Sequence, residues 1–376
     1  MSELHPVDLA RIPYVDGVLT ASQVAESAAS IAAMQEPSGA IPWTLGEHVD
    51  IWNHVEAAMA MLVGGHVEAA ERALAWIPTM QRDDGSWPMK IVGGQVDDPR
   101  GEVNMSAYFA VGLWHLWLVR RDISFIRRYW PSVRAGLDWV VSQQTEFGGI
   151  NWTPTESFSL LAGSSSIYQS LRAGVAIAEL VDDPQPEWEL AGGRLGHALR
   201  EHRDLFLEKA KFSMDWYYPV LGGAVRGQAG IDLISSRWDD FVVPGLGILC
   251  VDTNPWVTGA ETCELVMALD CLDDHARALR LYADMQHLRH ESGGYWTGYV
   301  HPDDVFWPAE QTTYTAAAVI LAADELSRTS PASGIMRGET LAAPFPEIGL
   351  ECGCTEEGAA EGSGEETSVD VLSRRS

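Results

Sequence analysis

The sequence predicts an all-α fold, an (α/α)6 toroid in which six helical hairpins form an inner and an outer ring around a central cavity. Two observations predict this fold. Helical segments with a single apolar stripe alternate along the chain with segments that are apolar on nearly every side. A Gln, Gly and aromatic pattern also recurs near the ends of the striped segments.

The two kinds of segment indicate two kinds of position. Segment 66–81 has Val67, Ala70 and Leu74 on one stripe and charges opposite, as an outer helix requires, whereas 103–119 is apolar almost all round and has to be buried on all sides. Outer helices are expected near 20–35, 66–81, 122–144, 187–210, 229–237 and 273–289. Inner helices are expected near 49–63, 103–119, 157–181, 216–228, 258–271 and 312–326.

The recurring pattern is expected to lock the helices together. Gly permits the left-handed turn that ends a helix, Gln can bond the backbone groups freed there, and Trp can pack across the hairpin. The pattern therefore predicts a scaffold and carries no chemistry. Its four occurrences are Gln35–Gly39–Trp43, Gln81–Gly85–Trp87, Gln144–Gly148–Trp152 and Gln286–Gly294–Trp296.

The chain divides into one large domain and two short C-terminal segments. Residues 1–329 are expected to form the toroid, and the proline-containing segment 330–346 a strap. Residues 347–376 are rich in Gly, Ser and Glu with few apolar residues, which predicts an acidic disordered tail.

Composition excludes several classes of function. The chain has 25 Lys and Arg against 53 Asp and Glu, a formal net charge of −28, which would repel a nucleic-acid backbone. No apolar run is long enough for an integral membrane span. The five cysteines and the absence of an apolar leader at the start predict a cytoplasmic protein. The oligomeric state is not predicted.

Two stretches carry a family resemblance. Gln81-Arg-Asp-Asp-Gly-Ser-Trp87 resembles the QW repeat of squalene and oxidosqualene cyclases, and Ser292-Gly-Gly-Tyr-Trp-Thr-Gly298 resembles a turn of protein prenyltransferase β-subunits. Over residues 20–330 the chain is similar to the terpenoid cyclase/protein prenyltransferase superfamily, and more narrowly to an actinobacterial family labelled "prenyltransferase". This resemblance implies transferase or cyclase activity on an isoprenoid. Six-hairpin glycosidases are neighbours of the same fold.

The chemical motifs of those families are missing. The sequence has neither the Asp-x-Asp-Asp acid of proton-initiated cyclases nor the Asp-Asp-x-x-Asp motif of metal-dependent prenyl diphosphate enzymes. Cys250-Val-Asp252 reverses the order of the prenyltransferase zinc ligands. No metal site is therefore assigned, and Mg²⁺ is expected only if the substrate is a diphosphate.

The loops that lead into the inner helices are expected to hold the site, because they are rich in acids and aromatic residues. Any single acid there is more often a helix cap, so the hypothesis depends on several converging on one cavity. Burial on apolar helices would raise the pKa values of Glu56, Glu261 and Glu264. The candidate catalytic residues are Asp50, Asp215, Glu261 and Glu310. The candidate substrate-binding residues are Trp43, Trp52, His54, Trp152, Trp216, Tyr217, Tyr218, Arg226, Trp256, Trp296 and Trp307.

We expect an enzyme that acts on an isoprenoid by acid-assisted carbocation chemistry, because aromatic faces stabilise cations and a neutral carboxyl can protonate an alkene. The first alternative is a carbohydrate-active, glycoside hydrolase-like enzyme with paired carboxylates. The second is a non-catalytic binding toroid. The lining of the cavity distinguishes the isoprenoid enzyme from the carbohydrate-active enzyme. An isoprenoid site should be apolar with one acid, and a sugar site should be polar with paired acids.

Overall fold

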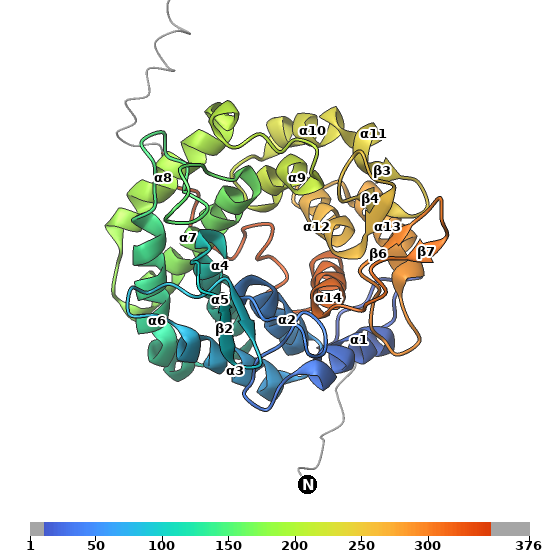
Figure 1. Ribbon diagram of the computed structural model, residues 1–376, viewed down its shortest axis with the longest axis horizontal. Coiled ribbons are helices and arrows are strands. Elements are labelled where there is room, and N and C mark those ends of the chain that lie inside the picture. The colour runs from blue at the N-terminus through green and yellow to red at the C-terminus, as the bar shows by residue number, and fades with distance from the viewer. Residues whose placement is uncertain (1–10, 347–376) are drawn as a thin grey trace, which may run out of the picture.

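The computed structural model describes residues 11–346 and confirms the (α/α)6 toroid (Figure 1). The tail predicted for residues 347–376 lies outside the described residues. The outer ring consists of α1 (Ala21–Met34), α3 (Val67–Trp76), α6 (Ile123–Val141), α8 (Pro186–Glu201), α10 (Gly227–Ser236) and α13 (His275–Asp284). The inner ring consists of α2 (Ile51–Val63), α4 (Val103–Ala107) with α5 (Phe109–Arg120), α7 (Leu161–Val181), α9 (Ser213–Leu221), α12 (Gly259–Asp270) and α14 (Thr313–Ser327).

The inner helices form a closed circle. Each packs against the next in the order α2, α5, α7, α9, α12 and α14, and α14 returns to pack against α2. Short turns lead from each inner helix to the next outer helix, whereas long segments lead from each outer helix to the next inner one. The inner helices therefore begin at the same end of the ring, where the long segments gather.

Short strands and helical turns lie in these long segments and were not predicted. They comprise strands β1 (Lys90–Val92), β2 (Gln95–Asp98), β3 (Val242–Val243), β4 (Gly247–Leu249), β5 (Trp256–Thr258), β6 (Gly298–Val300) and β7 (Val305–Phe306), the short helix α11 (Trp238–Phe241), and 3-10 turns at Ile77–Met80, Arg203–Leu205 and Met285–Leu288. β1 and β2 form an antiparallel pair, and β3 to β7 form an antiparallel sheet in chain order.

Three helix boundaries differ from the prediction. The fourth inner helix, α9, begins at Ser213 and ends at Leu221, so Gly222 and Gly223 form the turn to α10 instead of continuing the helix. The second inner helix is divided at Tyr108 into α4 and α5. The fourth outer helix, α8, ends at Glu201, before residues 202–212, which form a loop.

Three of the four glutamines of the repeat, Gln35, Gln81 and Gln144, tie neighbouring outer helices together, whereas Gln286 donates to Tyr282 O of α13, the helix that ends just before it (3.0 Å). The side-chain nitrogen of Gln144 donates to Gly148 O in its own turn (3.0 Å) and to Ala191 O in α8 (2.8 Å). Gln35 and Gln81 make the corresponding pairs of hydrogen bonds with α3 and α6. Gly148 has φ +96°, and a Cβ there would lie 2.6 Å from Arg194 O, so the turn requires glycine.

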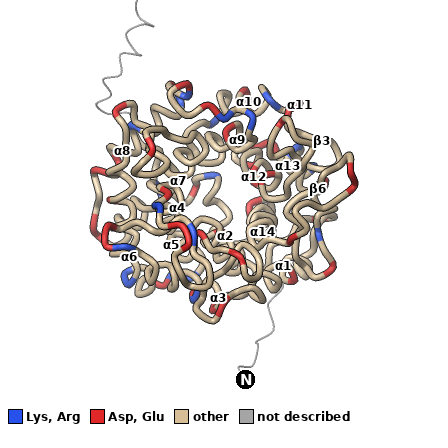
Figure 2. The backbone as a smooth tube through the Cα atoms, viewed as in Figure 1, with Lys and Arg blue, Asp and Glu red and all other residues tan. Residues whose placement is uncertain are grey.

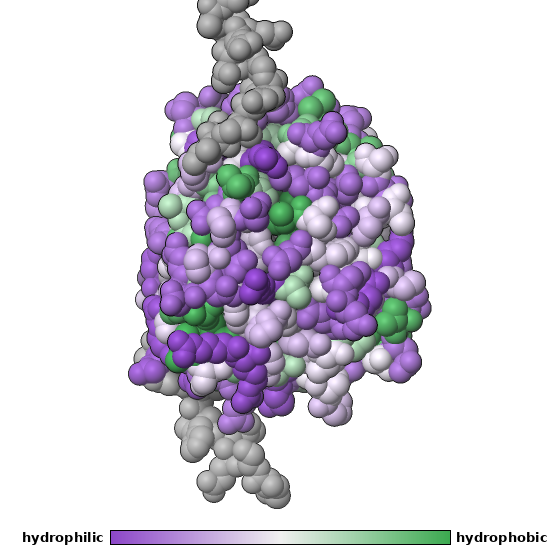
Figure 3. Space-filling view, turned by 90° about the vertical axis from the view of Figure 1, so that its left-hand side faces the viewer, coloured by the Kyte–Doolittle hydropathy of each residue, from purple (hydrophilic) through white to green (hydrophobic). Residues whose placement is uncertain are grey.

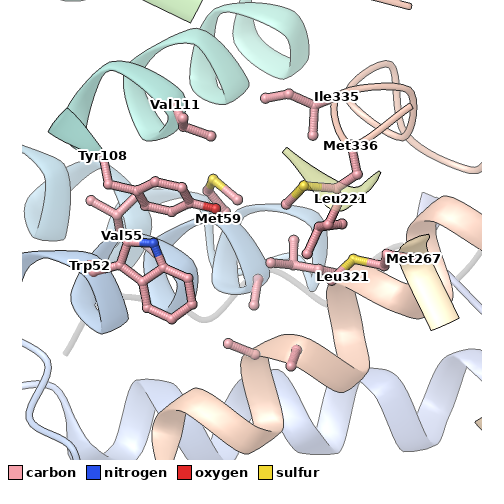
Figure 4. Close-up of a cluster of buried hydrophobic side chains, with 14 of the residues drawn as sticks. Trp52, Val55, Met59, Tyr108, Val111, Leu221, Met267, Leu321, Ile335 and Met336 are labelled. Atoms are coloured by element: carbon pink, nitrogen blue, oxygen red, sulfur yellow. The ribbon is translucent and has the colours of Figure 1, made fainter. Parts of the chain in front are cut away.

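The strap, residues 330–346, covers the end of the ring opposite the long loops. Its Ile335 and Met336 are buried among side chains that point inward from the inner helices, as Figure 4 shows. Met336 N donates to Glu325 (3.1 Å), and Arg337 pairs with Glu325 (2.6 Å) and with Asp270 (2.9 Å). The strap therefore fills this end of the central space and leaves the loop end for a site.

The outer surface is acidic and mixed in polarity. Acidic residues occur all around the outer ring (Figure 2). Hydrophilic residues cover most of the side that carries α6 and α8, where hydrophobic residues stand in separate small patches (Figure 3). Within residues 11–346, no helix combines the length and apolar character that crossing a bilayer requires.

The hydrogen bonds of Gln144 predict that replacing this residue destabilises the fold, and the adjacent Gln143 provides a control. Gln144→Ala removes both hydrogen bonds and leaves two carbonyls short of a donor, so it should lower the free energy of unfolding by about 1–3 kcal/mol. Within the described part of the chain, the Gln143 side chain donates to the neighbouring Ser142 hydroxyl and makes no bond to another helix, so Gln143→Ala should change this energy by less than about 0.5 kcal/mol. Urea unfolding of both variants measures the difference. Equal losses would contradict a locking role for the repeat.

Candidate active site

A pocket of about 220 Å³ opens among the starts of four inner helices, α2, α4, α7 and α9. Three methionines and two tryptophans supply most of its wall, and Glu102, Asn104 and Tyr218 supply its polar groups. We call this the first pocket. It is lined by Trp52, Met89, Glu102, Asn104, Met105, Trp152, Ala162, Gly163, Met214 and Tyr218.

Glu102 is the carboxyl group of the first pocket. It is the N-cap of α4, and its Oε2 accepts a hydrogen bond from Met105 N (2.5 Å). Burial, reinforced by the nearby charge of Asp50, raises the pKa of Glu102 to about 8. Glu102 is therefore protonated at neutral pH, the state that a general acid requires.

Asp50 is a second buried carboxyl, and its charge acts on Glu102. It is the buried N-cap of α2, and its two oxygens accept hydrogen bonds from the backbone N (2.9 Å) and the side-chain nitrogen (2.5 Å) of Asn53. His48 Nε2 lies 3.8 Å from Oδ2. Burial raises the pKa of Asp50, while the Asn53 hydrogen bonds and His48 act to lower it. Burial raises the pKa of both carboxyls, and Asp50 accepts two hydrogen bonds from Asn53 where Glu102 accepts one from Met105.

Two further carboxyls lie deeper in the ring, each bonded to tyrosine. Tyr217, Tyr218 and Tyr314 donate their hydroxyls to Glu264, and Tyr108 donates to Glu56. Burial raises the pKa of Glu264 to about 8, with the charge of Glu261 adding to it, and raises that of Glu56 to about 7. Tyr218 also lines the first pocket, so this network fixes part of its wall.

Trp43 and Glu310 lie beside the first pocket. Trp43 Nε1 donates to Glu310 Oε1 (2.9 Å), and the Trp43 ring contacts Tyr314 (5.7 Å between ring centres). Tyr314 in turn contacts Trp52 of the first pocket (5.3 Å between ring centres). Aromatic contacts therefore connect Glu310 with the pocket, although neither Glu310 nor the half-buried Glu261 lines it.

Two residues that were predicted to bind the substrate, His54 and Arg226, lie away from the first pocket. His54 is buried against the outer ring: its Nδ1 lies 3.0 Å from Ile41 N, and its Nε2 lies 2.9 Å from Ala73 O in α3. Arg226 lies at the strap end and donates to Met336 O (2.9 Å). Neither residue lines the first pocket. His54 lies on the side of α2 that faces α3, and Arg226 lies in the turn between α9 and α10 instead of on an inner helix.

The remaining predicted aromatic residues lie outside the first pocket. Tyr217 is fully buried, and Trp216 faces α10, where its Nε1 donates to Leu233 O (3.0 Å). Trp296 stacks on Phe306 of the five-stranded sheet. Trp256 and Trp307 form a pair at the rim of that sheet, with ring centres 5.1 Å apart. Of the predicted binding residues, Trp52, Trp152 and Tyr218 line the first pocket.

Glu102 was not among the predicted site residues. The signal was present, since this residue stands directly before the expected inner helix 103–119, in the kind of position that made Asp50 a candidate. The three methionines of the wall were not predicted either, because periodicity cannot distinguish them from core residues.

Two buried polar atoms of the first pocket have no hydrogen-bond partner within the described part of the chain: Trp52 Nε1, a donor, and Asn104 Oδ1, an acceptor. Buried polar groups are normally satisfied, so these atoms are available to a ligand that both accepts and donates hydrogen bonds. A hydroxyl group does both. Among residues 11–346, no group of three or more His, Cys, Asp or Glu is arranged to hold a metal ion.

Comparison with known proteins decides between the classes of enzyme. No family model matches the chain. The chain is 52% identical over 351 residues to the MMP endo-(1,4)-3-O-methyl-alpha-D-mannosidase of Mycolicibacterium hassiacum, covering 92% of this chain and 98% of that protein. The chain belongs to the family of this mannosidase.

Solved structures support the family's fold. A protein described as a wild-type glycosidase matches with a TM-score of 0.66 at 14% identity, covering 87% of this chain and 100% of that one. A GH63 mannosylglycerate hydrolase from Thermus thermophilus matches with a TM-score of 0.63 at 13% identity, over 80% and 99%. A D-mannose isomerase matches with a TM-score of 0.62 at 9% identity, over 82% and 97%.

The predicted isoprenoid chemistry is therefore wrong, as are the transferase and prenyltransferase assignments. The family is one of glycosidases, which was the first alternative. The resemblance misled because its motifs follow the ends of outer helices, where Gln81 donates to Gly85 O and Ser132 O and holds the scaffold together. The Mg²⁺ expectation depended on a diphosphate substrate and is withdrawn with it.

The raised pKa of the buried Glu264 predicts how the stability of the fold depends on pH. Its pKa is about 8 in the folded chain against an ordinary value of 4.5, so the folded state holds an extra proton between these values. The stability contributed by this group is fully present below about pH 4.5 and is lost as pH rises through about 8.

Urea unfolding of the unsubstituted chain and of Glu264→Gln across this range tests the sign. The unfolding free energy of the unsubstituted chain minus that of the variant should fall as pH rises. The exposed Glu47→Gln serves as the control for removing a carboxylate. A difference that grows with pH would contradict the assignment.

Proposed function

We propose that this protein is an endo-acting glycosidase that hydrolyses 1,4-linkages within a chain of 3-O-methyl-α-mannose. The observation that carries the proposal is the Glu102 and Asp50 pair beside a pocket walled by methionine and tryptophan. The 52% identical relative bears an activity of this kind in its name. The first pocket supplies physical reasons why such a substrate would fit.

The wall of the first pocket suits a methylated sugar. Tryptophan faces pack against the C–H faces of sugar rings, and methionine side chains adapt to irregular apolar groups such as a methoxy group. Trp52 Nε1 and Asn104 Oδ1 provide one donor and one acceptor for the ring oxygens and hydroxyls. A wall that combines apolar area with a few polar atoms fits a partly methylated sugar better than a fully hydroxylated one.

The carboxyl pair supports hydrolysis by proton transfer. Glu102 would donate its proton to the glycosidic oxygen as the bond from that oxygen to C1 breaks. Asp50 would accept a proton from the water whose oxygen attacks C1. The two halves of the chain leave with the elements of water added. Exchange with solvent then returns the proton to Glu102 and removes it from Asp50.

Hydrolysis of defined oligosaccharides tests the proposed activity. Chains of 1,4-linked 3-O-methyl-α-mannose should be cut internally to shorter oligomers, which mass spectrometry of the products detects. Matching chains without methyl groups should react more slowly, by about fourfold for each methyl that the pocket buries. Release of single sugars from one end, or no preference for methylation, would contradict the proposal.

The acid role predicts a pH profile. The activity should decline as pH rises through about 8, where Glu102 loses its proton. Glu102→Gln should lower kcat by about 10²–10⁴-fold and abolish this decline, because the amide cannot donate in the same way. Glu47→Gln, an exposed change near Asp50, is the matched control and should keep both kcat and the decline. A Glu102→Gln variant with the unsubstituted profile would exclude Glu102 as the acid.

A further inference from the structure

A second pocket lies next to the first, across the starts of α7 and α9. Its volume is about 200 Å³, close to that of the first. Leu161 and Asp215 line the second pocket, while their chain neighbours Ala162 and Met214 line the first. Asp215 Oδ1 accepts a hydrogen bond from Ala162 N (3.4 Å), which joins the two helices at this point. The two pockets therefore share one wall.

The charges around the second pocket cancel. Three basic and three acidic side chains line it: Arg203, Lys209 and Arg237 with Asp204, Glu208 and Asp215. Arg237 is already paired with Asp240 (2.8 Å) and Asp252 (2.7 Å). A site for an anion or a cation would need an excess of the opposite charge, so this lining favours a neutral ligand with many hydrogen-bonding groups.

The rest of the second pocket is apolar. Phe206, Leu207, Trp216 and Leu233 line it, and Leu207 remains 42% exposed. Apolar side chains beside hydrogen-bonding groups suit a sugar, which has C–H faces and hydroxyls. The second pocket is thus more strongly charged than the first, but it has a similar volume and shares a wall with it.

We propose that the second pocket is a sugar-binding subsite for the same chain whose neighbouring part occupies the first pocket. This inference rests on the proposed function. An enzyme that cuts inside a chain has to hold sugar units on both sides of the broken bond, and two adjoining pockets of similar volume provide such places. Asp215, in the shared wall, would position the chain by accepting a hydrogen bond from a hydroxyl.

Filling the second pocket tests the inference. Leu207→Trp places a large side chain at its exposed lining, while Leu205→Trp changes a 50% exposed leucine of the same segment that does not line it. Both variants are compared with the unsubstituted enzyme on 1,4-linked 3-O-methyl-α-mannose oligomers of increasing length. Thermal unfolding of each variant shows that the fold is kept.

For the unsubstituted enzyme and for Leu205→Trp, KM should fall as the oligomer grows long enough to reach the second pocket. In Leu207→Trp, KM should no longer decrease as the oligomer lengthens. Its KM for long oligomers should be about tenfold higher than that of the unsubstituted enzyme, and the position of cleavage should shift. Identical length profiles and products for all three proteins would overturn the inference while leaving the proposed function in place. If the unsubstituted protein cleaves no such oligomer, the proposed function is wrong, and the inference of a subsite is wrong as well.

Discussion

The packing of α14 against α2 closes the circle of inner helices, and the position of the site depends on that closure. In a closed circle linked by alternating short and long connections, all inner helices begin at one end and all long loops gather there. Residues far apart in the sequence, such as Trp52, Glu102, Trp152 and Tyr218, therefore meet around one pocket. The strap fills the opposite end of the central space with Ile335 and Met336, so the loop end is the one left for a site.

Closure also places carboxyl groups where water is scarce. Burial raises the pKa values of Glu56, Glu102 and Glu264 to about 7, 8 and 8, and each accepts hydrogen bonds from neighbouring groups that keep it in place. Burial also raises the pKa of Asp50, while its two hydrogen bonds from Asn53 and the nearby His48 favour the ionised form. Paired carboxyls held in unlike environments are what acid and base roles in glycoside hydrolysis require.

The sequence predicted the scaffold better than the site, for a physical reason. Amphipathic and fully apolar helices differ in their residues, so both rings and the locking role of Gln35, Gln81 and Gln144 were predictable. The direction of a side chain on a buried helix is set by its neighbours, which the sequence does not reveal. His54 was therefore misplaced. Arg226 was misplaced because the fourth inner helix ends earlier than predicted, at Leu221. Glu102 was missed although its position directly before an inner helix could have indicated it. The chemistry was mistaken because the recognisable motifs belong to the outer ring.

A crystal structure of Glu102→Gln with a bound 1,4-linked 3-O-methyl-α-mannose oligomer tests the central claim most directly. The account predicts a sugar unit in the pocket between α2, α4, α7 and α9, with a glycosidic oxygen within hydrogen-bonding distance of residue 102 and Asp50 near the same linkage. An oligomer bound elsewhere, for example between Glu261 and Glu310 with the first pocket empty, would contradict it.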